Sequence, residues 1–407
     1  MKILLINSDL ARNRGDRAIA EGLIALAKKS FPDAEITGIS EGSERDEQWF
    51  GIQFLSMDTQ SLNPLDFLRL LKAARQSDFI LWGGGELLKD YTNKLGLWYW
   101  TAKIGLLSLA NKNIYGTYQG IGPTRSTFSR KLIVWVVNRT RIFITRDQES
   151  ADKLKSWGVK NEVIASSDPA IYPQTGIAFS AQEVSLLQEC GITTNFLENC
   201  VGIGPRKWFH YAKSGLLPFK YRNRFKNLFG RQEKENPTFV TYKLALTAMV
   251  NQAISARRNV LLVPMHMGAN EADITLCEEL QSVCSNPEKV VVLKDDILPP
   301  ALLRKVIAHL DYFVGCRLHS TILSASAGVP SINYYYVDKG RQFFEQIHME
   351  DFSAPVEKLL EEDFASHHQE LVFKIEKNHQ AISEDLLNNI EELRGTVAKH
   401  FERIYEK

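Results

Sequence analysis

The sequence predicts an α/β protein with two doubly wound domains that face each other across a cleft. Short apolar runs alternate with helix-like stretches through most of the chain, which is typical of parallel sheets covered by helices. The alternation breaks after Asp168-Pro169-Ala170 and then starts again. A chain of 407 residues has room for two domains of roughly 150 to 200 residues each. We therefore expect a Rossmann-like arrangement in both halves.

The first predicted domain spans residues 1–176. Its opening stretch MKILLINSDL has too short an apolar run for a signal peptide and no small-residue cleavage site, so we interpret it as a strand. The predicted strands are Lys2–Ile6, Glu35–Ile39, Phe79–Trp82, Ile114–Thr117, Ile142–Thr145 and Val163–Ala165. The predicted helices are Ala18–Lys29, Leu65–Arg75, Leu95–Ala110, Phe128–Asn138 and Gln148–Trp157.

The second predicted domain spans residues 177–372, and residues 373–407 are expected to form a charged helical tail. The predicted strands are Cys200–Ile203, Val260–Val263, Val290–Val292, Tyr312–Val314 and Ser331–Tyr335. The predicted helices are Tyr242–Arg257, Glu271–Cys284, Pro300–Ala308, Ser320–Ala327 and Gly340–His348. Gly328-Val329-Pro330 ends one of these helices in the usual way.

Composition narrows the class of protein. The formal net charge is +1, so no general positive field attracts nucleic acid. The five cysteines form no Cys-x-x-Cys pair, which indicates reduced thiols rather than a disulfide framework or a zinc site. No apolar run is long enough to span a bilayer. We expect a cytoplasmic protein that is either free in the cytoplasm or located at the inner face of the cell membrane.

Residues 206–234 break the alternation of strands and helices. This segment holds nine Lys or Arg against one Glu, interleaved with aromatic residues. Such a composition suits peripheral contact with an anionic membrane surface or single-stranded nucleic acid. It also suits a solvated insertion whose aromatic residues pack on their own domain.

The second half places cationic side chains at the carboxyl ends of several predicted strands. Arg317 and His319 stand between a buried strand and a helix, where helix amides and a guanidinium favour an anion. Arg206, His266 and Lys339 follow three other strands. Five such residues at one edge of a sheet predict a pocket for a small, highly charged anion with an acid/base group. Local packing of His319 and a local carboxylate partner for Arg317 are the structural alternative.

Polar turns also follow the strands of the first half. Asp16 precedes a predicted helix, which it caps unless it binds a ligand hydroxyl. Gly84 and Gly85 allow close approach to the backbone but lack a dinucleotide-binding spacing. Gln119 lies in a tight turn, and Arg146 with Asp147 forms either an internal network or part of a site.

The ordered motifs resemble the polysaccharide pyruvyl transferases. The resemblance rests on NRGDRAI, WGGGELL, YQGIGP, TRDQES, SDPAI, IGPRKW, PMH and GCRLHSTILSASAGVP, which extend from residue 13 to about residue 340. Members of this family are similar in fold to the two-domain GT-B glycosyltransferases. The resemblance implies transfer of the pyruvyl group of phosphoenolpyruvate to two hydroxyls of a glycan sugar. The products are a cyclic ketal and phosphate, in the synthesis of cell-surface or extracellular polysaccharide.

The resemblance also implies residue roles. His319 is the expected general acid, and Arg206, Arg317 and Lys339 are expected to bind the donor. The acceptor-side candidates are Asp16, Gly84, Gly85, Gln119 and His266. Phosphoenolpyruvate is a co-substrate, and neither a cofactor nor a metal is expected.

Two departures bear on the acceptor. Arg17 follows Asp16 where an acidic residue is common in the family, and segment 206–234 is not expected in the family core. The acceptor would then be a glycan or a lipid-linked saccharide.

Two other functions stay open. One is a GT-B glycosyltransferase that uses a nucleotide sugar, since fold alone does not determine function. Such an enzyme is expected to hold the ribose with an acidic residue, and HSTILSASAGVP contains none. The other is a non-catalytic sugar-binding relative.

Overall fold

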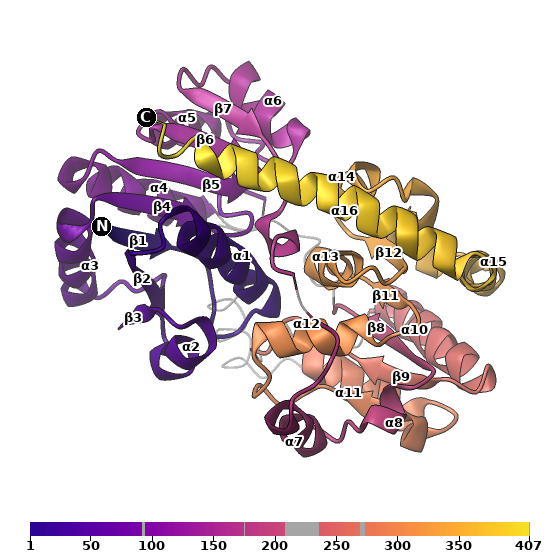
Figure 1. Cartoon of the computed structure of the whole chain (residues 1–407). Coiled ribbons are helices and arrows are strands. Elements are labelled where there is room, and N and C mark those ends of the chain that lie inside the picture. Colours follow the sequence, from indigo (N-terminus) through magenta and orange to yellow (C-terminus); the bar gives the residue numbers. More distant parts are fainter. Residues whose placement is uncertain (92–93, 175, 208–235, 269–272, 407) are drawn as a thin grey trace, which may run out of the picture. The chain divides into compact units, whose positions relative to one another are not determined.

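The computed structural model describes residues 1–91, 94–174, 176–207, 236–268 and 273–406. The chain divides into two compact units (Figure 1). Among the described residues, unit 1 comprises 1–173 and 393–406, and unit 2 comprises 174–207, 236–268 and 273–392. The predicted basic segment 206–234 lies outside the described residues from position 208 onward.

Unit 1 contains a seven-stranded parallel sheet in the order β3-β2-β1-β4-β5-β6-β7. The strands are β1 (Lys2–Ile6), β2 (Glu35–Ser40), β3 (Gln53–Ser56), β4 (Phe79–Gly83), β5 (Ile114–Gln119), β6 (Ile142–Thr145) and β7 (Glu162–Ala165). The helices are α1 (Arg14–Ser30), α2 (Ser43–Phe50), α3 (Pro64–Gln76), α4 (Lys94–Ala110), α5 (Thr127–Val137), α6 (Gln148–Ser156) and the 3₁₀ turn η1 (Pro169–Ile171).

Side-chain caps determine where several of these helices begin. Asn13, Asn63, Ser126 and Asp147 each accept a hydrogen bond from a backbone amide in the first turn of α1, α3, α5 and α6. These caps satisfy amides that have no partner within the helix. The sequence analysis predicted neither α2 nor β3. The strand β3 has only four residues and only one of them is buried, so its apolar pattern is weak.

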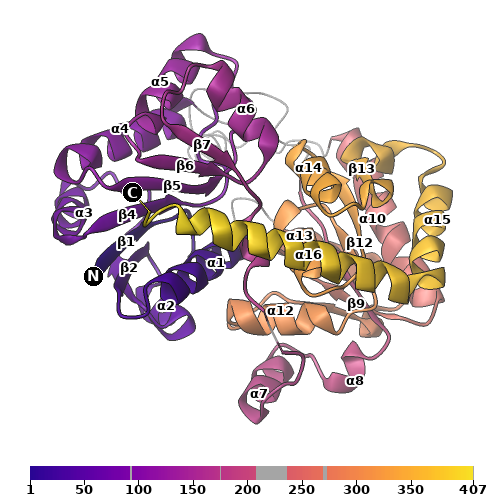
Figure 2. The same ribbon diagram turned by 45° about the horizontal axis from the view of Figure 1, so that its top comes forward.

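The core of unit 1 lies between the sheet and the helices α3, α4, α5 and α6. Leu70, Ile104 and Ile133 from these helices share one apolar cluster with Ile80 and Trp82 of β4. Figure 2 shows α3, α4 and α5 following one another along the sheet. This packing leaves the outer sides of the three helices open to solvent.

Unit 2 contains a six-stranded parallel sheet in the order β10-β9-β8-β11-β12-β13. The strands are β8 (Cys200–Gly204), β9 (Asn259–Leu262), β10 (Val290–Val292), β11 (Phe313–Gly315), β12 (Ser331–Tyr335) and β13 (Ser353–Pro355). The helices are α7 (Ala181–Glu189), α8 (Thr194–Leu197), α10 (Pro237–Ser255), α11 (Asp273–Val283), α12 (Pro300–Ala308), α13 (Leu318–Ser326) and α14 (Lys339–Gln346). Three 3₁₀ turns are η2 (Pro287–Lys289), η3 (Glu350–Phe352) and η4 (Val356–Leu360).

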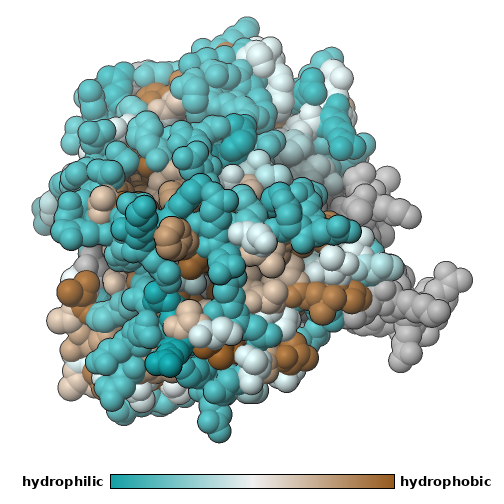
Figure 3. All heavy atoms as spheres, turned by 90° about the vertical axis from the view of Figure 1, so that its right-hand side faces the viewer, coloured by the Kyte–Doolittle hydropathy of each residue, from teal (hydrophilic) through white to brown (hydrophobic). Residues whose placement is uncertain are grey.

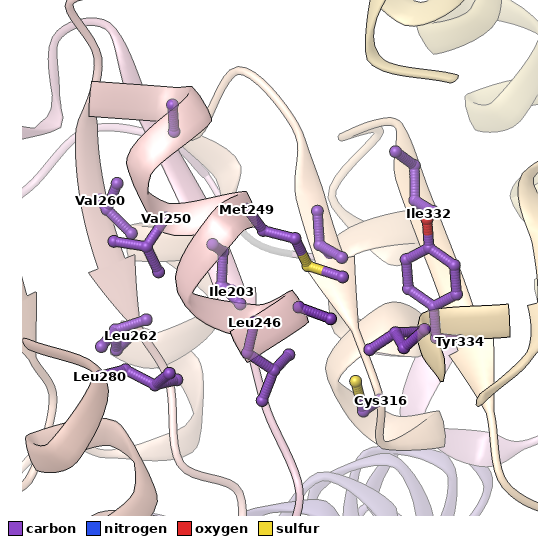
Figure 4. Packing of buried hydrophobic residues seen from close by; sticks show 14 of the residues in the cluster. Ile203, Leu246, Met249, Val250, Val260, Leu262, Leu280, Cys316, Ile332 and Tyr334 are labelled. Atoms are coloured by element: carbon purple, nitrogen blue, oxygen red, sulfur yellow. The ribbon is translucent and has the colours of Figure 1, made fainter. Parts of the chain in front are cut away.

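The core of unit 2 lies between α10, α11 and the strands. Figure 4 shows Leu246, Met249 and Val250 of α10 packed toward Ile203 and Leu262 of the sheet. These side chains are at most 2% exposed, so each contributes on the order of 1.5 to 3 kcal/mol of transfer free energy. This core holds β8 and β11 side by side, and both strands lead into the candidate site.

The C-terminal region is helical. Helix α15 (Phe364–Lys377) packs with its buried face in the core of unit 2, where Leu371 and Ile375 belong to the same apolar cluster as α10. Helix α16 (His379–Glu402) follows, and its end from residue 393 onward belongs to unit 1. In that part, the carbonyl of Val397 accepts a hydrogen bond from the Tyr118 hydroxyl at 2.6 Å.

The prediction of two parallel, doubly wound sheets is confirmed. In each sheet the strand order reverses at one point, between β1 and β4 in unit 1 and between β8 and β11 in unit 2. Ligands of open α/β sheets bind outside the carboxyl ends of the strands at such a switch point. The fold therefore indicates one candidate binding position in each unit.

Unit 2 should lose stability in mild acid through His368. Its imidazole is 2% exposed, it lies 3.1 Å from the Tyr334 hydroxyl, and burial lowers its pKa to about 4. Below the ordinary pKa of about 6.5 the unfolded chain takes up a proton that the folded chain does not, which costs about 2 kcal/mol between about pH 7 and pH 5. Urea unfolding of His368→Gln should show a weaker loss over this range.

The matched control for this experiment is His348→Gln, since His348 is exposed in the same unit. This variant should keep the pH dependence of the wild type. An unchanged slope in His368→Gln would contradict the prediction.

Candidate functional site

The switch point of unit 2 gathers the cationic residues predicted from the sequence. β9, β8, β11 and β12 are adjacent and parallel. His266 follows β9, Arg206 follows β8, Arg317 and His319 follow β11, and Lys339 follows β12. Because the carboxyl ends of parallel strands share one edge, these residues lie in that order along the rim of the sheet.

Arg317 is held by a buried carboxylate. Its Nε donates to Asp273 Oδ2 at 2.6 Å and its Nη2 donates to Oδ1 at 2.8 Å. Asp273 is fully buried, whereas the Arg317 side chain keeps 12% of its surface exposed. Asp273 Oδ2 also accepts the backbone N–H of His266 at 3.1 Å. One carboxylate thus orients the guanidinium and fixes the turn after β9, as a bidentate pair does.

Arg206 and Lys339 share an aromatic neighbour, Tyr336. The Arg206 guanidinium lies 3.8 Å from the centre of the Tyr336 ring, and Lys339 Nζ lies 5.8 Å from it. A phenol ring attracts cations over its face. The Arg206 backbone is fixed as well, because its carbonyl accepts from the Tyr242 hydroxyl at 2.9 Å.

A small pocket lies beside these cations. It is lined by Cys316, Leu318, Asn333, Tyr335, Tyr336, Val337, Lys339 and Gly340. Burial raises the pKa of the Cys316 thiol to about 11, which keeps it protonated at neutral pH. Cys316 belongs to the apolar core of unit 2.

His319 lies in the first turn of α13. The sequence placed the start of this helix at Ser320, but α13 begins at Leu318 because Arg317 already takes the N-cap position. Among the described residues, the Arg317 side chain makes no capping hydrogen bond to this helix. His319 is half-buried. The helix thus presents its amide end and an imidazole at the same rim of the sheet.

At the switch point of unit 1, Asp16 does not cap α1. Asn13 is the cap, and its side chain accepts from the amides of Gly15 and Asp16 at 2.9 and 3.3 Å. The predicted cap was wrong because α1 begins at Arg14, four residues earlier than its apolar period indicates. Asp16 Oδ1 instead lies toward Gly85, 3.3 Å from where a Cβ on that residue would stand.

Gly84 and Ser8 meet where β1 and β4 end. Gly84 has a φ of +102°, and a Cβ there would stand 2.8 Å from the Ser8 nitrogen and 2.9 Å from its Oγ. Only glycine combines this φ with such a close approach. Sequence reasoning identified Gly84 but missed Ser8, whose position two residues after the end of β1 was the available signal.

Gln119 is turned into the protein. Its side chain is fully buried, and its Nε2 donates to the carbonyl of Trp82 at 2.8 Å. It therefore braces β5 against β4 and supports the glycine turn after β4. All four acceptor-side candidates in unit 1 are buried, and the Gln119 side chain is fully so, whereas Asp16 keeps 9% of its surface exposed.

Arg146 forms the internal network that the sequence left open. Its guanidinium is 3% exposed and lies 3.5 Å from Glu86, 3.5 Å from Asp168 and 4.0 Å from Asp147. Asp147 and Asp168 also cap α6 and η1. The positive charge of Arg146 thus compensates the negative charges of carboxylates in the turns that follow neighbouring strands. Arg17, the departure noted in the sequence, donates to the carbonyls of Leu10 and Ala11 and so fixes the loop after β1.

Sequence reasoning also missed Tyr336. The run Tyr334-Tyr335-Tyr336 looks like the end of a strand, and only the tertiary structure distinguishes the buried Tyr334 from Tyr336 at the rim. Among the described residues, no group of three or more His, Cys, Asp or Glu side chains is placed to hold a metal ion.

Comparison with known proteins shows which family this chain resembles. A family model described as polysaccharide pyruvyl transferase matches residues 13–338. The amylovoran biosynthesis protein AmsJ of Erwinia amylovora is 22% identical over 395 residues, which cover 89% of each chain.

Solved structures show the same fold at low identity. A UDP-GlcNAc 2-epimerase from Neisseria meningitidis, bound to UDP-GlcNAc, is 12% identical with a TM-score of 0.57, and the match covers 99% of both chains. HepE of Anabaena, in complex with UDP, is 14% identical with a TM-score of 0.56, over 100% of this chain and 99% of that one. These likenesses confirm the GT-B-like fold.

Removing the charge of Asp273 should destabilise unit 2. Asp273→Asn keeps the shape of the side chain but leaves the guanidinium of Arg317 without its paired charge, which is expected to cost about 3 to 5 kcal/mol. Glu279→Gln on the same helix breaks the partly exposed pair with Lys243, whose two side chains keep 41% and 23% of their surface, and should cost less than about 1 kcal/mol. Urea unfolding of both variants checks this, and equal losses would contradict it.

Gly84→Ala should be more harmful than the same change at another glycine with positive φ. Gly158 has a φ of +93°, and a Cβ there would meet no atom within 4 Å. Both variants carry backbone strain, but only Gly84→Ala also overlaps Ser8, which is expected to add about 1 to 3 kcal/mol. Thermal unfolding of the two variants measures the difference, and equal destabilisation would show that Ser8 moves aside freely.

Proposed function

This chain belongs to the polysaccharide pyruvyl transferase family, and from that premise we propose that it transfers the pyruvyl group of phosphoenolpyruvate to two hydroxyls of a glycan sugar. The products of the proposed reaction are a cyclic ketal and inorganic phosphate. The observation that supports it most is the row of cationic side chains along the rim of unit 2, from Arg206 through Arg317 to Lys339.

Phosphoenolpyruvate needs cations for both its phosphate and its carboxylate. Arg206 and Lys339 flank Tyr336 on one part of the rim, and Arg317 follows the neighbouring strand. The amide end of α13 adds partial positive charge for an anionic group. We assign donor binding to Arg206, Arg317 and Lys339.

Asp273 has a positioning role in this proposal. A guanidinium on a flexible chain loses side-chain entropy when it binds an anion, and the bidentate pair with Asp273 has already fixed the Arg317 fork in the free protein. The pair also offsets part of the positive charge of the rim. Repulsion among the neighbouring cations is then smaller before the donor binds.

His319 is assigned as the general acid. A proton added to the methylene carbon of phosphoenolpyruvate leaves a cationic centre at the adjacent carbon, which one sugar hydroxyl attacks. The second hydroxyl attacks as the C–O bond to phosphate breaks. Of the two hydroxyl protons released, one restores the proton that His319 gave up and the other leaves with phosphate, so the atoms balance.

Acceptor binding is assigned to the switch point within unit 1, and within unit 2 His266 stays a separate candidate for it. Asp16 is a hydrogen-bond acceptor for sugar hydroxyls, and Gly84 and Gly85 allow an approach to the backbone. Gln119 supports this turn from below through its bond to Trp82. That AmsJ is an amylovoran biosynthesis protein supports a role in polysaccharide synthesis, and the proposed acceptor is a glycan or a lipid-linked saccharide.

The test is a reaction of the whole protein with phosphoenolpyruvate and candidate glycan or lipid-linked acceptors. The measurements are phosphate release and detection of the pyruvyl ketal by mass spectrometry and NMR. His319→Asn should lower kcat by about a hundredfold to ten-thousandfold, the usual contribution of a general acid, while saturation with phosphoenolpyruvate persists.

The matched control is His348→Asn, since His348 lies exposed in the same unit and should leave kcat unchanged. Undiminished ketal formation by His319→Asn would exclude its role as the acid. Saturable stabilisation by a nucleotide sugar, with none by phosphoenolpyruvate, would favour the glycosyltransferase alternative instead.

A further inference from the structure

Three neighbouring helices of unit 1 expose large apolar side chains to solvent. Among the described residues, sixteen large apolar side chains are exposed, and eight of them lie on or directly before α3, α4 and α5. The eight are Leu62, Leu65, Leu68, Trp98, Leu106, Leu109, Phe128 and Trp135. We call this surface the α3–α5 face. Single exposed apolar residues are ordinary, but a group of this size marks a contact surface.

Contacts join the three helices of the α3–α5 face to one another. The rings of Trp98 on α4 and Phe128 on α5 meet edge to face at 6.1 Å. Trp135 of α5 covers Gly105 of α4, where a Cβ would stand 2.2 Å from the indole ring. The Tyr99 hydroxyl of α4 donates to the carbonyl of Ser61, just before α3, at 3.0 Å. Each helix is therefore tied to the next.

Helix α4 is apolar on both of its sides. Its inner side supplies Leu97, Ile104 and Leu107 to the core of unit 1, yet its outer side presents Trp98 and Leu109, the latter 73% exposed. An amphipathic surface helix carries polar residues on its outer side. The outer side of α4 thus lacks the polar residues that are typical of a helix exposed only to water.

The charge of the same three helices is strongly positive. The sequences of α3, α4 and α5 contain seven Lys or Arg against one Asp, although the whole chain has a net charge of only +1. Six of the seven are exposed, and they are Arg69, Lys72, Arg75, Lys94, Arg130 and Lys131. The single acid, Asp66, pairs with Arg69 at 3.5 Å.

Apolar, aromatic and basic residues on one surface fit the interface of an anionic bilayer. Tryptophan and phenylalanine insert at the level of the headgroups while lysine and arginine contact lipid phosphates. The centre of a protein–protein interface is depleted in lysine, whereas Lys72, Lys94 and Lys131 are exposed on these helices. One face of the molecule, drawn in Figure 3, is mostly hydrophilic and carries several separate apolar groups.

No described helix is both long and apolar enough to cross a membrane.

We propose that the α3–α5 face docks the protein on anionic phospholipid. Trp98, Phe128 and Trp135 enter the headgroup layer together with the exposed leucines, and the surrounding cations bind phosphate. This surface differs from segment 206–234, and the proposal does not rest on pyruvyl transfer. A lipid-linked acceptor would reach the enzyme at such a membrane surface.

The test measures flotation of the full chain with vesicles of phosphatidylcholine alone and of phosphatidylcholine mixed with phosphatidylglycerol. The wild type should bind the mixed vesicles, and high salt should weaken binding because it screens the cations. The double variant L65E/L109E should bind the mixed vesicles at least about tenfold more weakly than the wild type. The change replaces two apolar contacts with negative charges, which the anionic lipid repels.

The matched control is L244E/F373E. Leu244 and Phe373 are 64% and 61% exposed in unit 2, against 66% and 73% for Leu65 and Leu109. All four sites are exposed, so circular dichroism should show that both double variants stay folded. The control should bind as the wild type does, and K72E/K131E should lose most of the preference for phosphatidylglycerol.

Two outcomes would overturn the proposal. One is binding of L65E/L109E equal to that of the control, which would assign membrane contact to another part of the chain, such as segment 206–234. The other is no vesicle binding by the wild type together with self-association that L65E/L109E abolishes, which would make the face a contact between copies of the chain. Phosphate release with a water-soluble acceptor is measured in parallel, so failure of docking and failure of the proposed transfer are distinguishable.

Discussion

The ion pair between Asp273 and Arg317 is the interaction on which the rim of unit 2 depends. It joins the start of α11 to the loop between β11 and α13, and the same carboxylate fixes the backbone of His266. A buried carboxylate is costly unless it is fully paired, and here each oxygen accepts at least one hydrogen bond. The pair therefore exists only when both loops are in place, which couples their geometry.

The remaining cations of the rim are supported by aromatic residues. Tyr242 holds the backbone of Arg206 from within the core, and Tyr336 provides a ring beside the guanidinium. Arg206 is 7% exposed, so its charge has little water around it. The ring of Tyr336 and the bond from Tyr242 help to place this cation at the rim.

The two units share the same sheet topology but carry different side chains at the switch point. In both, the strand order reverses once and the loops at that point diverge. Unit 2 fills the loops with cations, which suits a phosphate-bearing ligand. Unit 1 uses glycines, Ser8 and Asp16, and compensates its own acids internally through Arg146. A rim with hydrogen-bonding side chains and close access to the backbone suits a sugar, and the proposed division of donor and acceptor rests on that difference.

The sequence by itself determined the alternation of strands and helices, the position of Arg206, Arg317, His319 and Lys339 at strand ends, and the family. These features are local, because a short apolar run and the turn after it can be identified without knowing what they contact. It did not determine the partner of Arg317, the neighbour shared by Arg206 and Lys339, or the cap of α1. The Asp273–Arg317 contact joins residues 44 positions apart, and packing alone decides which tyrosine of a run reaches the rim. The exposed side of α4 was likewise hidden, since a helix that is apolar all round looks like core until its neighbours are known.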